Sequence, residues 1–201
     1  MNTFMNKYIR PAIVLTVLLT VLTGLIYPGI VTALAQLIFP YQANGSLHTV
    51  NGKVIGSDLI GQYWTSPRYF HGRPSATLSA ATGSPAPYSA DNSSASNLGP
   101  TSAALIQTVQ QRITQLRKEN PNAPTGPVPV DLVTASGSGL DPDISVAAAL
   151  YQVPRIASER GLSKDAVRQL IMNHFQGRFL GIFGEPYVNV LDLNLSLDTL
   201  K

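Results

Sequence analysis

An uncharged apolar segment near the start of the chain constrains the fold more than any other feature. From Pro11 to Phe39 the sequence contains no charged side chain, and none follows before Lys53. A helix rises about 1.5 Å per residue, so residues 12–34 would extend roughly 35 Å and cross a hydrocarbon core of about 30 Å once. The segment therefore predicts a single transmembrane helix, in which Pro28 would cause a kink.

The same segment has some features of a cleaved secretory signal. Lys7 and Arg10 resemble the positively charged start of a signal, and Ala33-Leu34-Ala35 has the small-x-small form of a cleavage site. The apolar part of a signal is about 7 to 15 residues long, which is shorter than this run. We therefore expect a retained anchor, with a cleaved signal and a buried helix of a soluble protein as alternatives.

Basic residues near the span predict its orientation. Lys7 and Arg10 precede it, whereas the next basic residue after it is Lys53. Because short loops rich in Lys and Arg stay in the cytoplasm, residues 1–11 should be cytoplasmic. Residues 35–201 should then form an extracytoplasmic domain, in the periplasm for a protein of the inner membrane. The absence of cysteine agrees with an oxidising compartment.

Composition limits what this outer part can be. Roughly 160 residues suffice for one domain with a core. The formal charge of the chain is +3, and Lys7 and Arg10 contribute two of these charges, so the outer part is too close to neutral for a typical nucleic-acid binder. Residues 77–100 consist mostly of Ala, Ser, Gly, Asn and Pro and should form an exposed loop, because such side chains bury little apolar area.

Turn and capping residues predict a mixed α+β domain. Asn51-Gly52 between two short β-prone runs predicts a hairpin. Asp141 before Pro142 is the expected N-cap of a helix that is broken or kinked at Pro154 and ends at Gly161. The remaining expected elements are a helix from residue 101 or 102 to 119, a strand over 130–135, a helix capped by Ser163, and a last strand over 187–198.

The last predicted strand contains an irregularity. Apolar and polar residues alternate from Tyr187 to Asp198, but the phase slips between Val190 and Leu191. A side chain changes face when the register shifts by one residue, so the slip predicts a bulge or the end of strand pairing at this point.

The few residues suited to catalysis do not form a recognisable pattern. His48, His71 and His174 lack a second ligand type at zinc-site spacing, so the sequence predicts no metal site. We expect His174 to be a histidine at the edge of the core. The run 136–139 has serine where a Gly-x-Ser-x-Gly motif needs its first glycine, so a hydrolase that combines Ser138 with His71 and Asp141 is only an alternative.

A Gly/Ser turn at residues 135–144 has the geometry of a phosphate site, because a strand, a turn and a helix N-terminus would follow one another. The lysine of a P-loop is missing, however, and Asp141 and Asp143 would stand where the phosphate should bind. We therefore expect a capped turn without a ligand.

The segment YFHGRP brings Tyr69, Phe70, His71 and Arg73 together. Aromatic and arginine side chains are typical anchors of protein interfaces. The segment therefore predicts either a contact with a partner protein or a loop packed onto its own domain.

Six motifs along the whole chain resemble one known family. The chain resembles the C subunits of Kdp-type potassium-transporting P-type ATPases, although Val146 and Tyr187 stand where proline and often arginine are expected. The motifs are FPYQANGSL (39–47), GSDLIGQ (56–62), YFHGRPSA (69–76), VDLVTASGSGLDPDIS (130–145), YQVPRIA (151–157) and VNVLDLNLSLD (188–198).

The resemblance implies a non-catalytic subunit of an ATP-driven, high-affinity potassium uptake complex in the cell inner membrane. The implied partners are a potassium-selective channel-like subunit, a P-type ATP-hydrolysing subunit, a small single-span subunit and membrane lipid. Small residues of the span, Gly24, Gly29 and Ala33, would let a partner helix approach closely.

The family is described as a catalytic chaperone that raises the ATP affinity of the hydrolysing subunit. An alternative is direct nucleotide binding near Gln152, with Ser138 and Gly139 of the Gly/Ser turn as further candidates. The predicted topology places Gln152 outside the cytoplasm, where ATP is scarce. We therefore expect assembly, stabilisation and capping of the outer potassium entrance, with ATP acting only through the complex and no cofactor bound by this chain itself.

Topology can be tested directly. A reporter enzyme that folds only outside the cytoplasm should be active when fused after Lys201, because the charges before the span hold the N-terminus inside. Activity of a cytoplasmic reporter at the same position would contradict the predicted orientation and would favour direct nucleotide contact.

Overall fold

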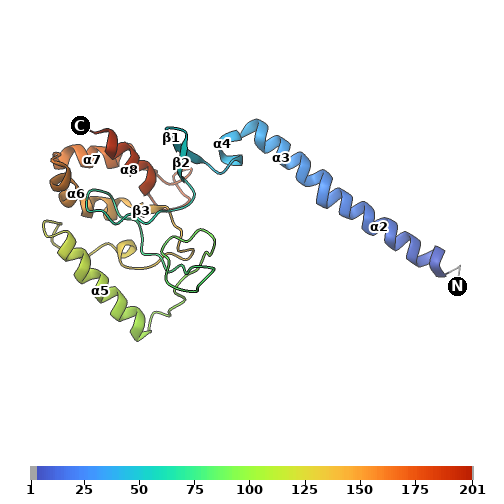
Figure 1. Ribbon diagram of the computed structural model, residues 1–201, viewed down its shortest axis with the longest axis horizontal. Coiled ribbons are helices and arrows are strands. Elements are labelled where there is room, and N and C mark those ends of the chain that lie inside the picture. The colour runs from blue at the N-terminus through green and yellow to red at the C-terminus, as the bar shows by residue number, and fades with distance from the viewer. Residues whose placement is uncertain (1–3, 201) are drawn as a thin grey trace. The chain divides into compact units, whose positions relative to one another are not determined.

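A helix without interruption forms most of the N-terminal unit of the computed structural model, which describes residues 4–200 (Figure 1). It comprises η1 (Met5–Ile9), α2 (Arg10–Val21), η2 (Leu22–Ile26) and α3 (Tyr27–Ile38). The stretch Asn6–Ile38 is long and apolar enough to cross a membrane, and its most apolar 18-residue window has a mean hydropathy of 2.2. This stretch includes the predicted span, residues 12–34. The exact limits of the span remain predictions.

Pro28 does not end this helix. The segment η2 just before it is a π-helical turn, and Pro28 lies in the first turn of α3. Proline lacks an N–H and its ring crowds the preceding turn, and a wider π turn is one way in which a helix accommodates both.

The second unit begins at His48, and its first elements form the predicted hairpin. After the short helix α4 (Pro40–Ala43), strands β1 (Leu47–Val50) and β2 (Lys53–Ser57) form a two-stranded sheet. Asn51 and Gly52 between them have φ values of 51° and 76°. Two consecutive positive φ angles are typical of the tight turn that Asn-Gly favours, so this prediction is confirmed.

Three helices and a small sheet enclose the core of this unit. They are α6 (Val146–Arg160), α7 (Lys164–Asn173), α8 (Val190–Thr199), β3 (Asp143–Ser145) and β4 (Tyr187–Asn189). The strands pair antiparallel, with Ile144 opposite Val188. The fold is therefore the predicted mixed α+β domain. Its core includes Phe70, Leu132, Ile144, Tyr151, Val153, Ile156, Val167, Leu170, Ile171, Val188, Leu193 and Leu197.

Several predicted helix ends are confirmed. Helix α5 (Ala103–Glu119) has the expected limits. Ser163 accepts a hydrogen bond from the backbone N–H of Ala166 (3.0 Å) and caps α7, and Gly161 ends α6 with a φ of 67°. Pro154 lies buried inside α6, which continues through it without a break.

Two predictions around the Gly/Ser turn are wrong. Residues 130–135 form no strand but begin with a 3-10 turn, η3 (Val130–Leu132). Asp141 does not cap α6, because its carboxylate accepts from the N–H of Asp143 (3.1 Å) while residues 143–145 pair with β4. Ser145 is the N-cap, accepting from Ala148 (3.0 Å), and Asp131 in turn accepts from the N–H of Ser145 (2.7 Å).

The predicted last strand is correct only for its first three residues. Asn189 ends β4 and accepts hydrogen bonds from the N–H groups of Leu191 and Asp192, which starts α8. The buried residues Val190, Leu193 and Leu197 follow helical spacing. The phase slip at residues 190 and 191 thus marks the change from strand to helix.

The loop 77–100 is largely exposed, as predicted, but it also makes contacts within the domain. Thr77 is buried, and the N–H of Ser94 donates to the carbonyl of Ser138 (3.0 Å). The loop therefore covers the Gly/Ser turn.

Candidate functional site

Two buried amide side chains hold the YFHGRP segment against α6 and α8. Asn194 accepts from the N–H of Phe70 (2.8 Å) and donates to its carbonyl (3.0 Å). Gln152 does the same for His71, at 2.8 and 3.0 Å. Asn194 and Gln152 are 0% and 1% exposed, so each amide satisfies backbone groups that water cannot reach. We call this arrangement the amide clamp.

Arg155 extends the amide clamp. Its Nη2 donates to the Gln152 carbonyl oxygen (2.7 Å), and its Nη1 donates to the carbonyls of Tyr69 (3.0 Å) and Pro67. Its Nε donates to Asn120 (3.0 Å). Burial lowers the pKa of Arg155 to about 10, partly offset by Glu119 and Glu159, so the guanidinium stays charged at neutral pH.

The segment's side chains are used in different ways. Phe70 is completely buried in the core. The Tyr69 hydroxyl donates to Asp198 (3.0 Å), and the Arg160 guanidinium lies 4.7 Å from the centre of its ring. The segment is therefore packed onto its own domain, while contact of Tyr69, Phe70, His71 and Arg73 with a partner remains a prediction.

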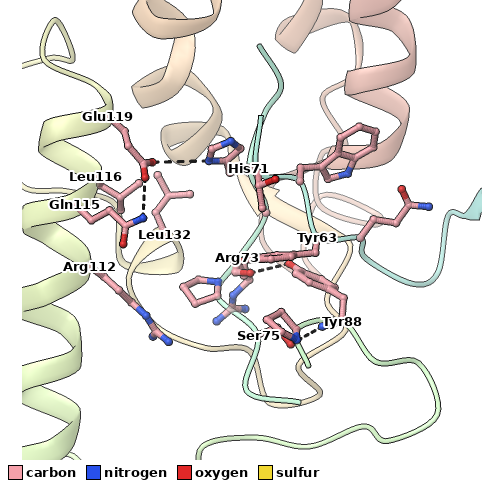
Figure 2. A pocket seen from close by; sticks show the side chains of 16 residues that line it. Tyr63, His71, Arg73, Ser75, Tyr88, Arg112, Gln115, Leu116, Glu119 and Leu132 are labelled. Carbon is pink, nitrogen blue, oxygen red and sulfur yellow. Dashed lines mark hydrogen bonds and ion pairs between the residues drawn. The ribbon is translucent and has the colours of Figure 1, made fainter. Parts of the chain in front are cut away.

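Beside this segment lies an open cavity of about 280 Å³ (Figure 2). Arg73 donates from Nη1 to Asp141 (2.9 Å), and the Tyr88 hydroxyl donates to the Arg73 carbonyl (2.7 Å). The cavity is lined by Gln62, Tyr63, Trp64, Thr65, His71, Gly72, Arg73, Pro74, Ser75, Pro87 and Tyr88, and by Arg112, Gln115, Leu116, Glu119 and Leu132.

The electrostatics of the cavity favour acceptor-rich groups. Burial, and then the charge of Arg155, lower the pKa of His71, which keeps the imidazole neutral at pH 7. Arg112 on α5 donates to the carbonyl of Val133 (2.9 Å), and burial lowers its pKa. Within residues 4–200, the buried donors Trp64 Nε1 and Arg73 Nε have no hydrogen-bond partner. The charge of Arg73 is paired with Asp141, and Glu119 also lines the cavity, so the unpartnered donors Trp64 Nε1 and Arg73 Nε are the groups that could receive an acceptor of a partner.

Ser138, Gly139 and Gln152, the residues considered for nucleotide binding, each make contacts within the domain. Gln152 uses its amide on His71, as described above. The N–H of Gly139 donates to Ser136 (2.8 Å), and a Cβ at Gly139 would lie 2.6 Å from the carbonyl oxygen of Ser94. Nucleotide binding by Ser138, Gly139 and Gln152 would have to compete with these internal contacts.

The structure also reveals a cluster that sequence spacing does not indicate. One ligand atom each of His48, Asp58 and Asp192 lies within 4.8 Å of the others, a geometry that could hold a metal ion. The sequence predicted no such group, because Asp192 is more than a hundred positions from His48 and Asp58 along the chain. His48 contacts Asp58 and lies 3.1 Å from the Asp192 carboxylate, so contacts within the domain account for the cluster.

His174 is confirmed as a residue at the edge of the core. Its two ring nitrogens lie 2.9 Å from the carbonyl of Leu170 and 2.8 Å from the hydroxyl of Ser196. These contacts satisfy the imidazole within the domain.

Comparison with known proteins points to one family. Residues 9–199 match the family model described as KdpC: K+-transporting ATPase, c chain. Proteins named potassium-transporting ATPase KdpC subunit are similar over nearly their whole length. That of Rhodopseudomonas palustris (strain BisB18) is 58% identical, covering 98% of this chain and 100% of the relative. Those of Methylobacterium nodulans and Sorangium cellulosum are 58% and 55% identical, covering 98% and 96% of this chain and 98% of each relative.

The role of Gln152 can be tested by substitution. Gln152→Leu should lower the free energy of unfolding by about 2–4 kcal/mol, because both backbone groups of His71 lose their partner. Chemical denaturation followed by the fluorescence of Trp64, the single tryptophan, measures this loss. The exposed Gln169→Leu is the control. A Gln152→Leu protein of unchanged stability but weaker ATP binding would contradict the structural role.

Asp143 should make stability depend on pH. Burial, followed by the charge of Asp141, raises its pKa from 3.8 to about 6, so stability is lost as the pH rises through about 6. Asp143→Asn keeps an oxygen for Asn189 and should raise the free energy of unfolding by about 1 kcal/mol at pH 8, with little change near pH 4. Denaturation curves at both pH values test this, and the exposed Asp165→Asn should not reproduce the gain.

Proposed function

Because the chain belongs to the KdpC family of K+-transporting ATPase subunits, we propose that it assembles and stabilises the potassium-transporting complex from the outer side of the membrane. The family description and the names of the relatives describe a subunit of the ATPase, and the chain is not itself the catalytic enzyme. The observation that carries the proposal is the amide clamp. It holds the YFHGRP segment, whose aromatic and arginine side chains are typical of protein interfaces, beside an open cavity. A preordered surface loses less conformational entropy on binding than a flexible one.

The expected partners are the channel-like subunit, the ATP-hydrolysing subunit and the small single-span subunit. Within the span, Gly24 and Gly29 have open space around the position of a Cβ, and Ala33 lies exposed on α3. A partner helix could therefore approach closely at these positions. In this proposal the outer domain covers the potassium entrance of the channel-like subunit.

We further propose that the chain raises ATP affinity indirectly, as a catalytic chaperone. Gln152 is 1% exposed and bonded to His71, which leaves its amide unavailable to a nucleotide. Contacts to the hydrolysing subunit would instead favour its ATP-binding conformation.

The test uses the whole complex with three substitutions in the span. Gly24→Leu, Gly29→Leu and Ala33→Leu together should lower the amount of this subunit that co-purifies with its partners by at least about tenfold, equivalent to about 1.4 kcal/mol. The apparent KM for ATP should rise to that of the complex without the subunit. Gly24→Ala, Gly29→Ala and Ala33→Ser keep small side chains and serve as the control.

Two results would contradict these proposals. Full retention of the leucine variant would show that the small residues are not a helix contact. Binding of ATP by the purified chain as tight as that of the complex would exclude an indirect effect.

A further inference from the structure

The loop between α7 and β4 exposes four large apolar side chains within five residues. Phe179, Leu180, Ile182 and Phe183 are 72%, 74%, 73% and 62% exposed. Scattered exposed apolar residues are common, but a contiguous group at the tip of one loop is typical of a binding surface.

This loop is an ordered hairpin. Gln176 and Tyr187 exchange two backbone hydrogen bonds, at 2.9 and 3.1 Å, and Phe179 and Phe183 do the same at 2.9 and 3.0 Å. Between these pairs, Arg178 donates to both carboxylate oxygens of Glu185, at 2.9 Å each. The apolar tip is thus presented in a defined conformation.

The tip residue Leu180 has an unfavourable backbone conformation. Its φ is 54°, in the left-handed region that large side chains rarely adopt and that Asn or Gly tolerates better. Since its side chain is mostly exposed, packing within the domain does not explain leucine here. Strain of this kind is concentrated at functional sites.

The charges of the hairpin suit an apolar environment. From residue 176 to 187 the only charged side chains are Arg178 and Glu185, and they pair with each other. The tip therefore has no net charge and no unpaired ionic group to desolvate.

The base of the hairpin lies where the chain from the span enters the domain. Asn189, two residues after the hairpin, donates to the carbonyl of Asp58 (2.9 Å), and Asp58 pairs with His48, the first residue of the second unit. Residues 39–47 separate this entry from the end of the apolar helix and can extend at most about 30 Å. A bilayer that holds the apolar helix would therefore lie within the reach of this linker from His48.

We propose that this hairpin tip inserts into the interface of the bilayer that holds the chain's own span. The exposed apolar area of the tip is of order 500 Å², which is less than the roughly 800 Å² per partner of a stable protein interface. It is sufficient for a loop that is already tethered to the membrane, because apolar and aromatic side chains partition into the boundary between headgroups and acyl chains. Insertion requires only the span and does not depend on the other subunits.

The natural absence of cysteine allows a direct test. Leu180→Cys in the full chain gives one attachment site for an environment-sensitive fluorophore, and Val130→Cys, at a residue 69% exposed, is the matched control. Both are placed without other subunits in vesicles of phosphatidylcholine and phosphatidylglycerol. The label at residue 180 should be quenched by lipids brominated on their acyl chains and should be several-fold less sensitive to aqueous iodide than the label at residue 130.

A second variant tests whether the apolar tip causes this protection. With the label at Phe183→Cys, adding Leu180→Lys should restore iodide quenching, while an unchanged thermal unfolding transition shows that the domain remains folded. Equal iodide quenching at residues 180 and 130 would overturn the proposal. Protection that develops only when the other subunits are added would also overturn it and would assign the tip to a partner protein.

Discussion

Satisfaction of buried backbone groups by the amide clamp is the interaction on which the α+β domain depends most. Phe70 is completely buried although it belongs to no helix or strand that the structure describes, so its N–H and C=O groups need side-chain partners. Asn194 and Gln152 supply them, and Arg155 fixes Gln152. Without these side chains, the burial of Phe70 in the core would leave unpaired polar groups, which cost more than a hydrogen bond contributes.

The amide clamp also determines the shape of the candidate site. Because His71 is held at its backbone, its side chain and that of Arg73 line the cavity beside α5 (Figure 2). Surfaces made of loops are usually mobile, because the backbone groups of loops have few hydrogen-bond partners. Here the side chains of α6 and α8 bond to the loop backbone and fix the conformation of the surface. A subunit that stabilises a complex through contact alone needs such a surface.

Two apolar features lie outside the core and have different origins. The helix up to Ile38 is apolar on all sides, as a membrane requires. The tip at Leu180 is small, neutral and held by a hairpin. The helix and the tip therefore expose apolar side chains for different structural reasons.

The sequence by itself determined features that depend on neighbouring residues: the apolar length of the span, the Asn51-Gly52 turn, the cap at Ser163 and the helix end at Gly161. Its motifs also indicated the family. Only the tertiary structure decided which residues meet across the chain. Asp141 lost its predicted capping role because β3 pairs with β4, and most of the predicted last strand became α8 because its helical stripe faces the core. The amide clamp joins His71 to Gln152 and Phe70 to Asn194, which are 81 and 124 positions apart, and the cluster at His48 includes the distant Asp192. Local patterns contain no signal for such contacts.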